Sequence, residues 1–272
     1  MFASLRSFGQ HTLRRWPALY ARAKRTYGYV SFRLGNPHEA DFAFFRNLCG
    51  TPGLFIDVGA NAGQSARSLR LFNQDLRIVS FEPNKLLEPE LRFTKRLLGA
   101  DYEYRMHGLG SARQTIELFV PLAGRTPMTP WATADRQTLE NNLPTIEREL
   151  GTRITVETVP VEILCFDDLE LVPTAVKIDV EGFEIDVLRG MLKTIEHARP
   201  VFMIEASHAT PEVHKLLRPF GYRFFLYSAE DNKLSECSGT IDSTNYFACP
   251  AKVLEQFARA GAPQVVAADP VN

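Results

Sequence analysis

The residues best suited to chemistry begin at the end of one hydrophobic run. In the stretch LFIDVGANAGQSARSL, Asp57 stands next to last in the run, and Gly59, Asn61 and Gly63 follow at every second position. Glycines at such a point let the backbone turn sharply and approach a neighbouring group closely. The loop lacks the third glycine of the dinucleotide fingerprint G-x-G-x-x-G, so a pyrophosphate cradle is not expected. The pattern predicts either a closely held ligand of another kind or a tight turn with no ligand.

A second acid narrows the kind of ligand. Glu82 ends the next hydrophobic run, roughly twenty residues after Gly63, where a carboxylate can accept hydrogen bonds from both hydroxyls of an adenosine ribose. The two runs together predict a nucleoside ligand without a pyrophosphate. S-adenosylmethionine meets that description. Its positive sulfonium also suits this chain, which is net negative beyond residue 38 because residues 1–38 hold seven basic residues and no acid.

Three further acids follow later hydrophobic runs. Asp179 and Glu181 flank Val180, so both side chains point to the same side if the strand continues that far. Two carboxylates so close can raise the pKa of one of them, which suits a base that removes a proton from a hydroxyl. Alternatively, Glu181 caps the following helix. Glu205 ends another run and is either a site residue or a favourable charge near a helix N-terminus.

The elements that must position these residues alternate between strand and helix. Such alternation predicts an α/β fold with a mostly parallel sheet that is covered by helices on both faces. The last two predicted strands have no helix between them, so we expect an antiparallel hairpin at one edge. The predicted strands are Leu54–Val58, Arg77–Phe81, Tyr102–His107, Thr115–Val120, Val156–Leu164, Ala175–Val180, Val201–Glu205, Arg223–Tyr227 and Asn245–Cys249.

The chain divides into three zones. Residues 1–50 form a basic, aromatic-rich lead-in, residues 51–250 form the α/β domain, and residues 251–272 begin as a helix and end in a Gly/Pro/Ala tail. Residues 121–153 interrupt the alternation and are too long for an ordinary connection. They are either a surface insertion or a lid that faces the substrate.

Composition and charge indicate which partners, metals and cellular compartment to expect. The 272 residues carry a net charge of −1, so no global basic field attracts nucleic acid. The four cysteines are scattered and show no metal-ligand spacing, so we expect no metal site and a reducing compartment, the cytoplasm. For the basic lead-in three interpretations stay open: contact with an anionic membrane surface, a transit peptide, or a helix packed on the acidic body.

Four sequence blocks, in this order and spacing, resemble a known family. FIDVGANAGQSA, SFEPN, VKIDVEGFEIDVLRG and PVFMIEAS are similar to blocks of the FkbM-type S-adenosylmethionine-dependent methyltransferases. The resemblance spans about residues 39–249. It implies a seven-stranded Rossmann-like sheet in which the last strand is antiparallel.

The resemblance also implies roles for single residues. Asp57, Gly59, Asn61 and Gly63 match the loop around the methionine part of the cofactor, and Glu82 matches the acid that binds the ribose. Residues expected near the adenine are Pro83, Asn84, His107, Gly108, Leu109 and Gly110. Asp179, Glu181 and Gly182 match the block that faces the transferred methyl, and Glu205 matches the acid that ends the fifth core strand.

The expected activity is O-methylation of a hydroxyl on a sugar, a glycan or another secondary metabolite, with S-adenosyl-L-methionine as the cofactor. One alternative is a nicotinamide-dependent oxidoreductase, which the missing G-x-G-x-x-G disfavours. The other alternative is a non-catalytic module that retains the fold.

Overall fold

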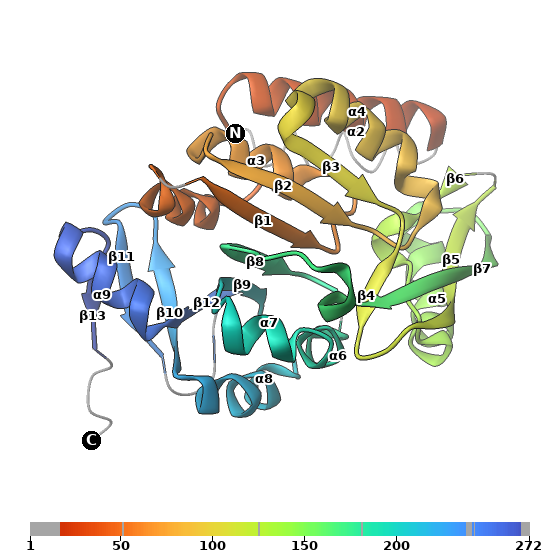
Figure 1. The fold of residues 1–272 in the computed structure, drawn as a ribbon. Coiled ribbons are helices and arrows are strands. Elements are labelled where there is room, and N and C mark those ends of the chain that lie inside the picture. Colours follow the sequence, from red (N-terminus) through yellow and green to blue (C-terminus); the bar gives the residue numbers. More distant parts are fainter. Residues whose placement is uncertain are drawn as a thin grey trace.

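The computed structural model describes residues 17–50, 52–124, 126–180, 182–237, 241 and 243–267. In this part of the chain the main sheet has nine strands in the order β13-β11-β10-β12-β9-β8-β1-β2-β3 (Figure 1). Their bounds are β1 (Gly53–Val58), β2 (Leu76–Phe81), β3 (Tyr102–Arg105), β8 (Ala175–Ile178), β9 (Val201–Glu205), β10 (Tyr222–Ser228), β11 (Lys233–Glu236), β12 (Asn245–Pro250) and β13 (Gln264–Val266).

The strand order reverses between β1 and β8. From β1 the chain proceeds outward through β2 and β3, then returns to β8 on the other side of β1 and continues to β9, with all neighbouring pairs parallel. Val58 and Ile178 are partners at the carboxyl ends of β1 and β8. The loop that starts at Gly59 and the acid Asp179 therefore emerge side by side. In open parallel sheets this is the place where ligands bind.

The predicted fold class is confirmed, but the number of strands differs. As predicted, β12 runs antiparallel to its neighbours, between β9 and β10. The expected hairpin of β10 and β12 does not lie at the edge, however. The open side of β10 pairs with β11, and β11 pairs with β13. The two extra strands arise because an uncovered strand edge offers unpaired backbone groups that nearby segments can satisfy.

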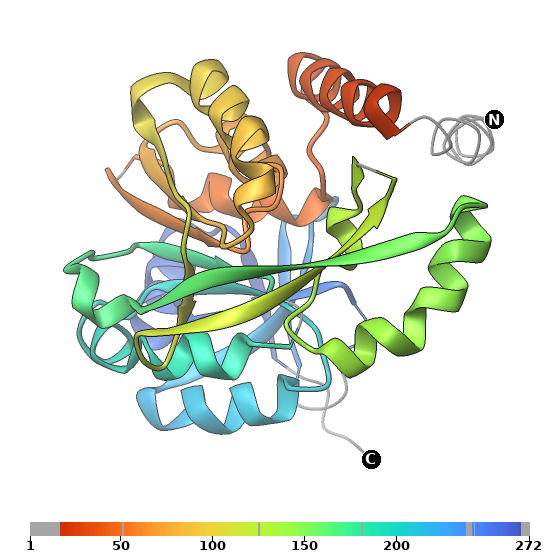
Figure 2. The same ribbon diagram turned by 90° about the vertical axis from the view of Figure 1, so that its right-hand side faces the viewer.

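A second sheet branches off after β3. It has the order β4-β7-β5-β6 and is built from β4 (Gly108–Gly110), β5 (Gln114–Ala123), β6 (Thr126–Pro127) and β7 (Ile154–Cys165). The long pair β5 and β7 extends past the carboxyl edge of the main sheet (Figures 1 and 2). Helix α5 (Arg136–Leu150) packs on one face of the pair through Leu139 and Ile146. Residues 121–153, the interruption seen in the sequence, include the end of β5, β6 and α5.

Helices cover both faces of the main sheet. One face holds α3 (Gln64–Phe72), α4 (Glu88–Leu98), α9 (Ala251–Ala260) and α2 (Pro17–Arg33), and the other holds α6 (Glu184–Arg189), α7 (Leu192–His197) and α8 (Thr210–Leu217) (Figure 1). Residues 184–197 form two short helices, α6 and α7, and not one continuous helix. The division falls at Gly190, where an added Cβ would lie 2.0 Å from the carbonyl oxygen of Gly110. In the described part of the chain, no helix is long and apolar enough to span a membrane.

The described part of the lead-in, residues 17–50, contributes to the core. Its 3-10 helix Ala40–Leu48 buries Phe42, Phe44 and Phe45 completely against the main sheet. The preceding helix α2 lies on α4, where Arg25 pairs with Glu90 at 2.6 Å. The lead-in thereby brings the residues between α2 and the 3-10 helix to the carboxyl edge of the sheet.

We predict a large loss of stability for Phe44→Ala. The Phe44 ring is buried and stacks on Phe247 with a centroid distance of 4.3 Å, so truncation leaves a cavity. The free energy of unfolding, measured by urea denaturation, should fall by about 3–5 kcal/mol. The control Val172→Ala, at a side chain that is 73% exposed, should change it by less than about 0.5 kcal/mol. An equal loss of unfolding free energy in the two variants would show that Phe44 of the lead-in is not part of the core.

Candidate active site

A cavity of about 260 Å³ lies between the carboxyl edge of the main sheet and the second sheet. The main sheet contributes polar groups to it, and the second sheet contributes an apolar wall. Its polar lining includes Asn61, Glu82, Asn84 and Asp179, and its apolar lining includes Leu109, Ile116, Leu118, Val161, Ile163 and Phe183. Apart from Leu109, sequence reasoning missed the residues of the apolar wall, because the position of the second sheet follows from tertiary packing.

Glu82 is the most constrained acid of the cavity. Its side chain is buried, and its two oxygens accept hydrogen bonds from the backbone N–H groups of Asn61 at 2.7 Å and Asn84 at 2.9 Å. Burial raises the pKa of the Glu82 carboxyl to about 7, although the two hydrogen bonds act in the opposite direction. Each carboxylate oxygen keeps a further lone pair for a ligand hydroxyl.

The glycine loop is held against two strand ends. The N–H groups of Gly59 and Ala60 both donate to the carbonyl of Phe81, at 3.0 and 3.1 Å. Gly59 has a φ of +80°, and an added Cβ would lie 1.8 Å from the carbonyl oxygen of Asp179. Only glycine fits that position. The loop also leaves the Oδ1 atom of Asn61 buried without a hydrogen-bond partner in the structure, so a ligand donor would satisfy it.

Strand register places Asp57 between two polar partners. Asp57 is paired with Ser80 on β2 and with Lys177 on β8. Ser80 Oγ donates to Asp57 Oδ2 at 2.8 Å, and Lys177 Nζ lies 2.8 Å from Asp179 Oδ2. Burial lowers the pKa of Lys177, but the attraction of Asp179 and Asp57 outweighs it, so the net shift is upward and the buried ammonium stays charged.

Asp179, one of the two close carboxylates, has a lowered pKa. Burial raises it, but the ion pair with Lys177 and a hydrogen bond with Glu205 outweigh burial and hold it below the ordinary value. Asp179 is therefore a weak base. Glu181, the other member of the expected pair, lies outside the described residues.

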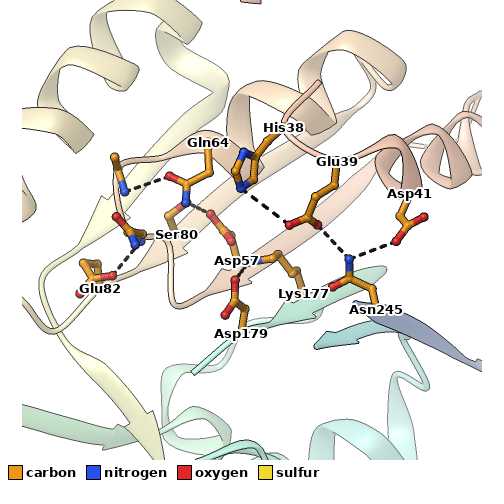
Figure 3. A network of polar contacts seen from close by, with 12 residues as sticks. His38, Glu39, Asp41, Asp57, Gln64, Ser80, Glu82, Lys177, Asp179 and Asn245 are labelled. Carbon is orange, nitrogen blue, oxygen red and sulfur yellow. Dashed lines mark hydrogen bonds and ion pairs between the residues drawn. The ribbon is translucent and has the colours of Figure 1, made fainter. Parts of the chain in front are cut away.

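A polar cluster from the lead-in completes this edge of the sheet. We define the lead-in cluster as His38, Glu39, Asp41 and Asn245 (Figure 3). Asn245 Nδ2 donates to Glu39 Oε2 at 2.9 Å and to Asp41 Oδ2 at 3.1 Å, and His38 Nε2 lies 3.7 Å from Glu39 Oε1. None of the four was expected to be a site residue. Asn245 and Glu39 are 206 positions apart, so only the fold brings them together.

A buried glutamate that sequence reasoning also missed fixes the loop after β8. Glu184 accepts from the N–H of Gly182 at 2.9 Å and from Ser207 Oγ at 3.1 Å. Through these two hydrogen bonds Glu184 connects the loop that follows Asp179 to the loop that follows β9. The signal in the sequence was a third acid, shortly after Asp179 and Glu181.

The structure brings most of the expected site residues to one place. Those that line the cavity are Gly59, Asn61, Glu82, Pro83, Asn84, Gly108, Leu109 and Asp179. Those that do not line it are Asp57, Gly63, His107, Gly110, Gly182 and Glu205. Asp57 is fully buried within β1, Gly63 precedes α3, and His107 Nδ1 lies 3.4 Å from Glu162. Within the described ranges, no group of three His, Cys, Asp or Glu residues is arranged to hold a metal ion.

We predict that Lys177→Met destabilises the protein at neutral pH. The methionine fills the space but leaves Asp57 and Asp179 without their cation, so the free energy of unfolding should fall by about 3–5 kcal/mol. Burial already raises the pKa of Asp57 above its ordinary value, and without Lys177 it rises further, while the pKa of Asp179 rises above its unfolded value. The loss is therefore present at high pH and shrinks as the pH falls through the raised pKa values.

Urea denaturation from about pH 8 to about pH 5 measures this effect. The control is Arg223→Met, which removes a half-exposed pair with Glu236 and should cost less than about 1 kcal/mol. A loss for Lys177→Met that is no larger than the control, or that grows on acidification, would contradict the prediction.

Solved structures similar to this chain include several methyltransferases. Methyltransferase FkbM from Methylobacillus flagellatus KT is 15% identical, with a TM-score of 0.45 over 72% of this chain and 43% of that chain. The TehB-like SAM-dependent methyltransferase from Corynebacterium glutamicum is 8% identical, with a TM-score of 0.41 over 84% and 93% of the two chains. An rRNA methylase from Streptococcus thermophilus is 8% identical, with a TM-score of 0.40 over 78% and 94%. The chain spans less than half the length of the Methylobacillus protein.

The family comparison covers the same part of the chain as the cavity. The methyltransferase FkbM domain matches residues 57–224, which is more than half of the sequence and includes both the glycine loop and Asp179. No curated protein matches the chain. On the extent of the domain match, this chain belongs to the FkbM methyltransferase domain family.

Proposed function

We propose that the protein is an S-adenosylmethionine-dependent O-methyltransferase. The observation that carries the proposal is Glu82, a buried carboxylate that two backbone N–H groups orient and that lines the cavity. Its free lone pairs match the two hydroxyls of a ribose. Membership in the methyltransferase family supports the same reading.

The residues around Glu82 fit the rest of the cofactor. Leu109 and Ile163 offer an apolar wall for an adenine ring, and Pro83 lies beside them. The unpartnered Oδ1 of Asn61 is an acceptor for the ammonium of the methionine part. Gly59 keeps this surface free of a side chain. When bound, S-adenosylmethionine supplies an electrophilic methyl group on a positively charged sulfur.

The chain's own groups would position both reactants. Asp179 is ionised and fixed by Lys177, so it places a negative charge at the end of β8, beside the cavity. That charge favours a cationic ligand. The apolar wall excludes water from the same space, which strengthens these interactions. We propose a hydroxyl on a sugar, a glycan or another secondary metabolite as the acceptor.

Ligand-induced thermal stabilisation tests the proposal against the alternatives. S-adenosylhomocysteine, added in excess, should raise the melting temperature of the purified protein, because it binds only the folded state. NADH should leave the melting temperature unchanged. Stabilisation by NADH alone would favour an oxidoreductase, and no response to either ligand would favour a non-catalytic module.

We predict that binding of S-adenosylhomocysteine releases protons near pH 7. The free carboxyl of Glu82 has a pKa of about 7, so about half of the molecules are protonated at that pH. Hydroxyls that donate to the carboxylate lower this pKa, so binding expels the proton and the affinity falls as the pH drops. Calorimetry in buffers of different ionisation enthalpy measures the release.

Glu82→Gln is the matched control, because the amide keeps the shape of the side chain but does not titrate. It should weaken binding about 10- to 100-fold and remove the Glu82 contribution to proton release. Equal proton release by wild type and variant, or equal affinity, would exclude Glu82 as the ribose ligand.

A further inference from the structure

The loop that carries His38 is fixed to elements on both sides. The backbone N–H of His38 donates to Ser68 Oγ on α3 at 2.7 Å, and the next residue, Glu39, accepts from Asn245 on β12. Phe42 and the rings that follow it are buried in the core directly after this loop. His38 is therefore held in place, although its own side chain is half exposed at 51%.

His38 belongs to the same electrostatic environment as the cavity. Burial lowers its pKa, Lys177 and Arg67 lower it further, and Glu39 and Asp179 raise it, with a net shift downward. The charged groups that face it therefore come from the lead-in, β8 with its following residue, and α3. The imidazole is neutral at neutral pH and able to accept a proton.

The acids nearby are less suited to that task. Asp179 is paired with Lys177, and its pKa is held low. Glu82 is engaged by backbone donors at the other end of the cavity. Glu39 faces His38 through one oxygen, while Asn245 fixes the other oxygen. A carboxylate in this place orients an imidazole and stabilises the imidazolium that forms when it takes a proton.

We propose that His38 is the general base that deprotonates the acceptor hydroxyl, that Glu39 stabilises the resulting imidazolium, and that Asn245 is a positioning residue for Glu39. This inference rests on the proposed function. Nε2 faces Glu39, so Nδ1 is the nitrogen that receives the proton. This assignment requires the acceptor to approach from the side of the lead-in.

The step balances without a further reactant. As the acceptor oxygen forms its bond to the methyl carbon, the carbon–sulfur bond breaks and its electron pair stays on sulfur. The hydroxyl proton passes to Nδ1 of His38. The imidazolium is half exposed and returns the proton to solvent.

Removal of the imidazole tests the inference. His38→Ala should bind S-adenosylhomocysteine with an affinity within about twofold of wild type, because in this proposal the imidazole contacts the acceptor and not the cofactor. Transfer of labelled methyl from S-adenosylmethionine to acceptors in a cell extract should fall about 100-fold or more. At saturating S-adenosylmethionine, where the titration of Glu82 does not limit binding, the acid limb of the pH–rate profile should disappear, and added imidazole should restore part of the rate. Glu39→Gln should cause a smaller loss.

His208→Asn is the matched control. His208 is an exposed histidine on the loop after β9, and its replacement should retain both the rate and the acid limb. Full activity of His38→Ala with an unchanged acid limb would overturn the inference, as would a loss confined to His208→Asn. Failure to bind S-adenosylhomocysteine in the wild type would instead refute the proposed function.

A second measurement does not depend on the acceptor. Sinefungin resembles S-adenosylhomocysteine but carries an amine, which is positively charged, at the place of the transferred methyl. If His38 faces that place, NMR titration of labelled histidine should give a pKa for His38 about half a unit or more lower with sinefungin than with S-adenosylhomocysteine. Equal pKa values in the two complexes would overturn the inference.

Discussion

Buried carboxylates at the carboxyl edge of a parallel sheet must be compensated, and this constraint organises the site. Asp57 receives a hydroxyl from Ser80 and faces Lys177, Asp179 is paired with Lys177, and Glu82 is held by two backbone N–H groups. Removal from water penalises each of these charges unless such partners are present. Because the cation of Lys177 compensates its charge, Asp179 stays ionised. Compensation by backbone N–H donors alone leaves the pKa of Glu82 at about 7, and the free lone pairs of its carboxylate can accept hydrogen bonds from a ligand.

The topology places two of these differently compensated acids, Glu82 and Asp179, within one cavity. Reversal of the strand order at β1 and β8 opens the edge of the sheet, and the second sheet covers the opening with apolar side chains. The cavity therefore has one polar wall and one apolar wall. That combination suits a nucleoside, which presents a hydrophobic base and a polar sugar. The lead-in brings His38 and Glu39 to a third side, where a second reactant could approach.

The sequence predicted the features that depend on local pattern. Hydrophobic runs followed by acids placed Glu82 and Asp179 at strand ends, and the glycine loop was identified from Gly59, whose backbone conformation excludes a side chain. Features that depend on register and long-range packing were not predictable in this way. Asn245 contacts Glu39 only because β12 lies beside β9, and the additional strand β11 forms only because β10 has an open side. The low pKa of Asp179 requires Lys177, whose ion-pair partner the sequence alone did not identify.

The central claim is that the Glu82 carboxylate binds the two ribose hydroxyls of an adenosyl ligand. A crystal structure of the complex with S-adenosylhomocysteine tests this claim most directly. Both hydroxyls should lie within hydrogen-bond distance of the carboxylate, with the backbone N–H groups of Asn61 and Asn84 still in place. An adenosyl group bound elsewhere, or a ribose turned away from an unchanged Glu82, would contradict it.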